Sequence, residues 1–334
     1  MQISRRDFLR LSALGLGSAL LVACGMDETL LTPEPTVLPT YTHLAPTQTP
    51  FPPTATSASE ILHNMGFDAF EGKVQTHQDD RYLYVESDGM PDHPLMIGIK
   101  SWQQQVPLPQ FYVGNNAWRI PLNPVLAEQP LSAKTNLYRG AIALAVNGVP
   151  IFNALNNRGD DAYLAGELDE WGGHSGRADD YHYHVAPLHL QEIVGANSPI
   201  AYALDGFPIY GSTEPDGSPL SELDELNGHF DAHGAYHYHG TNTYPYINGG
   251  MRGVVEVRDD QIEPQPRTVP IRPSLQPLRG ATITDFQTIG NESYSLEYQI
   301  NGQKAYVNYR VSGKTYTFEF LDATGNKTTE IYTG

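Results

Sequence analysis

Paired histidines that flank a tyrosine are the residues of this sequence best suited to chemistry. The string Tyr-His-Tyr-His occurs twice, at residues 181–184 and 236–239. In each copy a Gly-His dipeptide places one more histidine eight residues before the first histidine of the string. Neutral imidazole is a common ligand of transition metals, so the repeat indicates metal binding. The predicted metal ligands are His174, His182, His184, His229, His237 and His239.

The spacing of these histidines suggests how they could meet at one ion. Side chains alternate between the two faces of a strand, so His182 and His184 project from one face and the tyrosines from the other. His174 follows a flexible glycine and is placed to supply a third ligand. Two sites with three histidines each, and one site shared by both copies, fit the spacing equally well. Three imidazoles leave a fourth position for water or substrate, as in catalytic zinc sites.

Composition narrows the chemistry further. Cys24 is the only cysteine, so a mature chain anchored through it has no thiolate metal site, disulfide or cysteine nucleophile. Ligation by imidazole alone favours copper or zinc as the cofactor. The chain has 20 Lys and Arg against 38 Asp and Glu, a net charge of −18. Such a charge repels phosphate backbones, and we expect no nucleic-acid partner.

Other uses of the histidines stay open at this point. The rings could form a hydrogen-bonded polar core, or a network of general acids and bases without metal. In a cell-surface glycan-binding or adhesion module, tyrosines would stack on sugars and the histidines would be structural. A metal-dependent hydrolase or copper oxidase would need an acid or base beside the open position. The sequence singles out no such group, so enzymatic activity and substrate are undecided.

Several polar residues near the motifs are weaker candidates for the site. Carboxylates beside the histidine strands could orient imidazole N–H groups. Asp205 is explained more simply as a turn residue, His233 has no counterpart in the first copy, and His189 is expected to be structural. The supporting candidates are His93, His233, Asp179, Asp180, Asp205 and Asp231.

The duplication extends beyond the histidines. Residues 142–152 align with residues 200–210, and both segments contain two apolar runs separated by Asn-Gly or Asp-Gly, a strong hairpin signal. The Gly-His and Tyr-His-Tyr-His segments align with an offset of 55 residues. The sequence therefore predicts two copies of one unit, at 142–187 and 200–242, packed about a pseudo-twofold axis.

These motifs resemble the bacterial YHYH-domain family, which is named for the Tyr-His-Tyr-His string. The resemblance includes both copies of the string, Gly172-Gly173-His174, residues 203–211 (ALDGFPIYG) and residues 88–93 (DGMPDH). It covers about residues 80–255. The resemblance implies that the histidines matter and supports the domain boundaries, but it supplies no reaction, because the family has no assigned activity.

The start of the chain predicts export and lipid anchoring. Arg5 and Arg6 lie in a twin-arginine pattern, SRRDFLR at residues 4–10. The apolar stretch up to Ala23 is too short to span a bilayer, and the sequence LVAC ending at Cys24 resembles a lipobox. We expect the export machinery to handle this chain and a lipid on Cys24 to anchor it outside the cytoplasm, at the periplasmic face or cell surface. Loss of residues 1–23 removes three Arg and one Asp, which changes the charge from −18 to −20.

Proline-rich segments divide the remaining chain. After a signal peptide at 1–23, residues 24–59 are rich in Thr and Pro and predict an extended linker. We expect a β domain at 60–260, a second Pro-rich linker at 261–281 and a small four-stranded β domain at 282–334. Asn301-Gly302 and Ser312-Gly313 mark turns in that last domain. The predicted fold class is mainly β, with a duplicated core domain followed by a small antiparallel meander.

Overall fold

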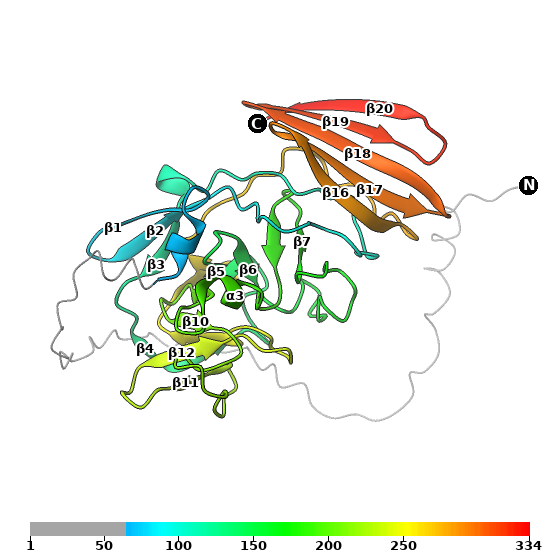
Figure 1. Ribbon diagram of the computed structural model, residues 1–334. Helices are drawn as coiled ribbons and strands as arrows, with labels where there is room; N and C mark the ends of the chain where they lie inside the picture. Colours follow the sequence, from blue (N-terminus) through cyan, green and yellow to red (C-terminus); the bar gives the residue numbers. More distant parts are fainter. Residues whose placement is uncertain (1–64) are drawn as a thin grey trace, which may run out of the picture. The chain divides into compact units, whose positions relative to one another are not determined.

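The central sheet is built from the two predicted repeats. The computed structural model describes residues 65–334, and eight short strands pair in the order β11-β12-β10-β9-β5-β6-β8-β7. They run from green to yellow in Figure 1. The strands of the first repeat are β5 (Ala141–Ala145), β6 (Pro150–Phe152), β7 (Gly173–Ser175) and β8 (Tyr181–Tyr183), and those of the second are β9 (Ala201–Ala203), β10 (Pro208–Tyr210), β11 (Gly228–Phe230) and β12 (Tyr236–His239).

The strand order is symmetric about the junction of β5 and β9. In each repeat the second strand of the hairpin pairs in parallel with the histidine strand, β6 with β8 and β10 with β12. The strands β5 and β9 are antiparallel, with Leu144 opposite Tyr202. These two residues are equivalent in the alignment of the repeats, so a pseudo-twofold axis passes between them. The predicted arrangement of the duplication is confirmed.

Burial and glycine geometry explain the hairpins at this junction. Every residue of β5 and β9 is buried, in keeping with their unbroken runs of apolar residues. The turns contain Gly148 and Gly206, at φ 80° and 96°. A Cβ on Gly148 would lie 2.5 Å from the Cβ of Ser87, and one on Gly206 would lie 2.5 Å from the carbonyl oxygen of Pro121. Glycine is therefore required both for backbone conformation and for close packing.

Smaller sheets and short helices surround the central sheet. One sheet has three strands, and two have two strands each. These strands are β1 (Gln75–Gln78), β2 (Tyr82–Glu86) and β3 (Trp118–Pro121), then β4 (Leu126–Ser132) with β13 (Gly250–Gly253), and β14 (Glu256–Arg258) with β15 (Gln261–Glu263). The helices are η1 (Phe67–Phe70), η2 (Gly114–Asn116) and α3 (Leu190–Val194).

The C-terminal meander has five strands, so the prediction of four strands was wrong by one. The strands, orange to red in Figure 1, are β16 (Thr282–Gly290), β17 (Ser293–Ile300), β18 (Gln303–Ser312), β19 (Thr315–Leu321) and β20 (Lys327–Thr333). The missed strand, β16, has two register shifts against β17. Its apolar residues Ile283, Phe286 and Ile289 are three positions apart in the sequence, as expected of a strand with bulges. This spacing hides the alternation typical of a regular strand.

The proline-rich segment 261–281 makes close contacts with the histidine-bearing repeat. The buried Arg272 side chain forms an ion pair with Asp179, with 2.7 Å between Nε and Oδ2. The meander also contacts the chain that precedes the first repeat. The backbone N–H of Ile283 on β16 donates to the carbonyl of Ile99, and the Tyr309 hydroxyl on β18 donates to the carbonyl of Pro107. The division into two domains at this segment stays a prediction.

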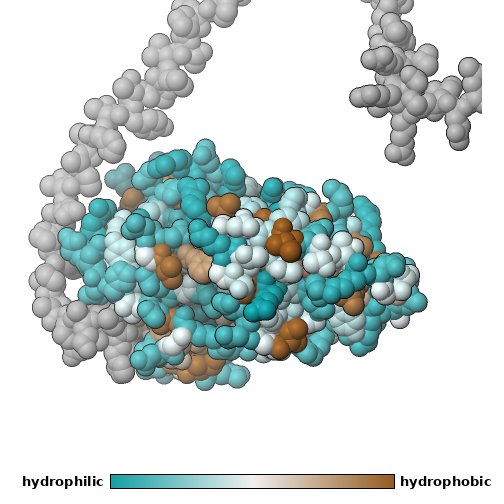
Figure 2. Space-filling view, turned by 90° about the horizontal axis from the view of Figure 1, so that it is seen from above, coloured by the Kyte–Doolittle hydropathy of each residue, from teal (hydrophilic) through white to brown (hydrophobic). Residues whose placement is uncertain are grey.

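Several predictions fall on residues outside the described range. They include the signal peptide, Arg5 and Arg6, the lipid anchor Cys24 and the linker at 24–59. Among residues 65–334, no helix has both the length and the apolar character needed to cross a bilayer. Figure 2 shows one face of the molecule, on which hydrophilic residues dominate and apolar residues form separated patches.

Candidate metal centre

The first repeat brings His174, His182 and His184 together into what we call the first centre. His174 on β7 lies directly opposite His182 in the antiparallel register of β7 and β8. His184 follows β8 and lies on the same face as His182. The Nε2 atom of His184 is 3.1 Å from that of His174 and 3.2 Å from that of His182. The three rings therefore converge through the same ring nitrogen.

Backbone carbonyls determine which ring nitrogen is free. The Nδ1 atom of His182 lies 2.9 Å from the carbonyl oxygen of Asp180, and that of His184 lies 2.5 Å from the carbonyl oxygen of Asn153. A carbonyl oxygen can only accept a hydrogen bond, so each Nδ1 carries the proton. In the neutral ring Nε2 then has a lone pair, and two such lone pairs face each other across 3.2 Å.

Burial disfavours a proton as the cation between these rings. It lowers the pKa of His174 to about 3, with a further contribution from nearby His184. It also lowers the pKa of His182 and of His184. At neutral pH the rings are neutral, and the opposed lone pairs call for a different cation.

The second repeat forms an equivalent cluster, the second centre, from His229, His237 and His239. His229 on β11 lies opposite His237 on β12. The Nε2 atom of His229 is 3.0 Å from that of His237 and 3.3 Å from that of His239. His239 also donates from Nδ1 to a backbone carbonyl, that of Gly211 at 2.9 Å. Burial lowers the pKa of His239 to about 4 and lowers that of His237.

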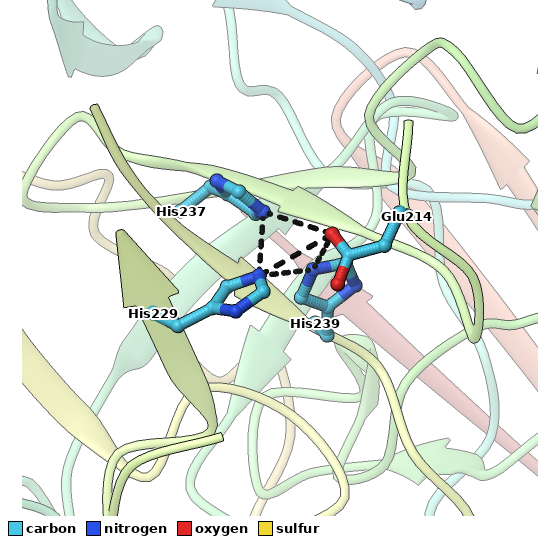
Figure 3. A group of neighbouring side chains, drawn as sticks. All are labelled: Glu214, His229, His237 and His239. Carbon is cyan, nitrogen blue, oxygen red and sulfur yellow. Dashed lines mark hydrogen bonds and ion pairs between the residues drawn. The ribbon is translucent and has the colours of Figure 1, made fainter. Parts of the chain in front are cut away.

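A carboxylate completes the second centre. Figure 3 shows the side chain of Glu214 directed at the three rings. Its Oε2 atom lies 3.4 Å from Nε2 of His229 and 3.6 Å from Nε2 of both His237 and His239. A tetrahedron with edges of about 3.4 Å has its centre about 2.1 Å from each corner, close to zinc–nitrogen and zinc–oxygen bond lengths. The four donor atoms thus enclose a position suited to a tetrahedral ion.

Glu214 is ionised in this environment. Although burial opposes its charge, hydrogen bonds from Ser221 and the neighbouring rings of His229 and His239 lower its pKa to about 2. The backbone N–H of Ser221 donates to Oε1 at 2.8 Å, which leaves Oε2 facing the histidines. Sequence reasoning missed this residue. Alignment of the repeats with the 58-residue offset could have indicated it, because a carboxylate at position 214 stands where the first repeat has Asn156.

Asn156 makes the first centre different from the second. Its side chain donates to Glu167 at 3.3 Å, and Glu167 also pairs with Arg158. Among residues 65–334, no carboxylate lies with His174, His182 and His184 as Glu214 lies with its three histidines. These three histidines instead line a cavity of about 870 Å³. The first centre is therefore open and the second is closed by a fourth ligand.

Comparison with protein families gives one match, which includes the first centre. Residues 117–219 match the model of the family described as YHYH protein. The chain carries a YHYH domain. The match contains the whole first centre, the second hairpin and Glu214, and it ends before the histidines of the second centre. No curated protein and no solved structure matches the chain.

Two aspartates that sequence reasoning missed hold the histidine strands of the two repeats. Asp169 accepts hydrogen bonds from the Tyr181 hydroxyl at 2.8 Å and from the backbone N–H of Gly173 at 3.1 Å. Asp224, 55 residues later, accepts from the Tyr236 hydroxyl and the N–H of Gly228 at the same distances. Each carboxylate thereby ties a Gly-His strand to its partner. Burial raises the pKa of Asp169 to about 6.

The supporting carboxylates proposed from the sequence have other partners. Asp179 binds Arg272 and the N–H of Val106, and Asp205 accepts from the Tyr238 hydroxyl at 2.7 Å. The Asp180 carboxylate is 3.9 Å from Nδ1 of His182, whereas its own carbonyl is 2.9 Å away. Burial raises the pKa of this carboxylate to about 7.

The remaining turn carboxylate and its neighbour lie at the surface. Asp231 accepts from the N–H of His233 and of Ala235 and so shapes a turn. His233 is exposed. Where carboxylates were expected to orient imidazoles, backbone carbonyls do so for His182, His184 and His239.

His93 and His189 lie on the tyrosine face of β8, away from the first centre. The Nε2 atom of His93 is 2.7 Å from the Tyr183 hydroxyl, and its ring stacks on Trp171 with centroids 4.8 Å apart. The ring of His189 makes T-shaped contacts with the rings of His93 and Trp171. Burial lowers the pKa of His93 and of His189 to about 4. Both histidines therefore pack with aromatic side chains behind the strand.

Proposed function

We propose that this protein binds two transition-metal ions, one in each histidine centre. The opposed Nε2 lone pairs of His182 and His184, 3.2 Å apart while both Nδ1 atoms donate to carbonyls, are the observation that carries the proposal. A metal ion accepts such lone pairs together, and a backbone carbonyl behind a histidine ligand is a common way to fix its tautomer. A polar core without metal would leave these atoms in mutual repulsion.

Copper or zinc suits both centres, and the second centre is best suited to zinc. Its donor set is three imidazoles and one carboxylate in tetrahedral arrangement, and zinc accepts this geometry without electronic penalty. The first centre offers three imidazoles and an open fourth position. A closed site is typical of a structural ion and an open one of a catalytic or exchangeable ion. We assign the second ion to stability and the first to activity.

The proposed location is outside the cytoplasm, on a membrane. The twin-arginine pattern at Arg5 and Arg6 and the lipobox ending at Cys24 support it. A Cys24→Ala variant should carry no lipid and should keep residues 1–23, because acylation and removal of that segment both require the lipobox cysteine. Mass spectrometry of the protein extracted from the membrane fraction measures this. A wild-type chain that carries no lipid on Cys24 would refute the lipid anchor.

Metal content tests the central proposal. Purified protein should hold about two Cu or Zn ions per chain. The double variant His182→Ala/His184→Ala should retain one ion, and so should His237→Ala/His239→Ala, because the centres use separate ligands. Elemental analysis after dialysis against metal-free buffer gives these ratios. The variant His233→Ala is the matched control, since this exposed histidine belongs to neither centre.

Two outcomes would contradict the proposal. A metal-free protein whose stability does not change with chelator would favour the glycan-binding or adhesion module. Loss of both ions from either double variant, with the fold retained, would indicate one shared site.

A further inference from the structure

The cavity at the first centre has the size of a small-molecule site. Its volume is about 870 Å³, within the range usual for ligand pockets. His174, His182 and His184 form part of its wall, so a molecule in the cavity can reach the open position of the centre.

The charge of this cavity differs from that of the chain. The chain as a whole has 38 acidic against 20 basic residues. The cavity wall instead contains four arginines, at positions 139, 158, 177 and 267, against the carboxylates of Glu167, Asp180 and Asp260. Arg158 and Arg267 are paired with carboxylates. Within the described part of the chain, Arg139 and Arg177 have no carboxylate partner. One guanidinium N–H of Arg177 donates to the Ser274 hydroxyl at 3.0 Å, and its other N–H groups remain available to an anion.

The second repeat provides an internal comparison. By the 55-residue offset, Ala232 stands where Arg177 stands in the first repeat. By the 58-residue offset, Glu214 stands where Asn156 stands. The second repeat therefore has an apolar residue in place of a cation and a carboxylate beside its three histidines. The cation and the open position occur together in the first repeat.

We propose that this cavity binds a small oxyanion, a carboxylate or phosphate compound, with one oxygen at the open position of the first centre. The cavity provides the room for it, and Arg139 and Arg177 attract its charge. This inference rests on the proposed metal in the first centre, which it extends to a class of ligand.

Titration of the cobalt-loaded protein tests the proposal, because Co²⁺ reports its own coordination through its visible spectrum. The probes are oxalate, malate and inorganic phosphate, with glycerol as the uncharged control. At least one oxyanion should change the spectrum with a millimolar or tighter dissociation constant, and glycerol should not. Comparison of the three probes separates carboxylate from phosphate ligands.

Variants show whether the wall residues take part. Arg139→Gln and Arg177→Gln should each weaken binding of the oxyanion about 10-fold, as expected for loss of a charged hydrogen bond. Arg258→Gln, which changes an exposed arginine outside the cavity wall, is the control and should bind like the unaltered protein.

The results separate this inference from the metal proposal. Two bound Co²⁺ ions with no response to any oxyanion would overturn the inference and leave the metal sites intact. A response equally strong in the Arg139 and Arg177 variants would also overturn it, because the anion would then bind through the metal alone. Failure of Co²⁺ to bind would refute the metal proposal itself.

Discussion

Removal of metal should lower the melting temperature of the protein by about 15 °C. A ligand present at about 1,000 times its dissociation constant stabilises the folded state by about 4 kcal/mol per site. Two sites then contribute about 8 kcal/mol, and each kcal/mol shifts the melting temperature by about 2 °C in a chain of this size. Calorimetry of the protein with zero, one and two equivalents of Zn²⁺ measures the shift.

The order of filling gives a sharper form of this prediction. The second centre has four ligands, so the first equivalent of Zn²⁺ should fill it and produce at least half of the shift. The variant His237→Ala/His239→Ala should lose that part, and His233→Ala should melt like the unaltered protein. An identical melting temperature with and without chelator would rule out both centres as sources of stability.

Acid should destabilise the metal-free protein as the pH falls from 6.5 towards about 4. The folded state depresses the pKa of His93, His174, His182, His184, His189, His237 and His239. Such histidines stabilise the fold above their unfolded pKa of about 6.5, and this contribution is lost as the pH falls towards a folded pKa of about 4. Each histidine changes the free energy of unfolding by about 1.4 kcal/mol per pH unit in that window.

Buried aspartates act in the opposite direction over the same pH range. The pKa values of Asp169, Asp179, Asp180 and Asp205 are raised, so these groups add stability as the pH falls. The seven histidines exceed the four aspartates by three groups, and we expect a net loss of at most about 4 kcal/mol per pH unit between pH 6.5 and about 4.

Urea denaturation at pH 7, 6 and 5 measures this slope. Saturating Zn²⁺ should flatten it near pH 6, because the metal keeps the imidazoles deprotonated. A metal-free protein with the same free energy of unfolding at pH 7 and pH 5 would contradict the buried, neutral state of these rings.

The two repeats share one arrangement of strands and histidines but differ beside the histidine cluster. Both hold three histidines through the same register and a carboxylate clamp, at Asp169 and Asp224. A single difference, Asn156 against Glu214, separates an open centre from a closed one. The two clusters share no side chain, so each can form without the histidines of the other.

The sequence alone determined the local features of this protein. The period-two placement of histidine and tyrosine predicted that one face of each strand carries ligands, since alternation is a property of the strand itself. The Asn-Gly and Asp-Gly turns predicted the hairpins because their conformation is local. The repeat offsets predicted the pseudo-twofold sheet, because similar units bury similar faces. Strand β16 was not predicted, because its bulges interrupt the alternation of apolar and polar residues.

Only the tertiary structure decided which groups meet. The choice between one shared site and two separate centres depended on the β5–β9 junction, which places the histidine strands at opposite ends of the sheet. Glu214 and the carbonyls of Asn153 and Gly211 join the centres from loops, where sequence spacing does not fix side-chain direction. The cavity also arises from long-range packing, because its wall combines segments that lie far apart in the sequence.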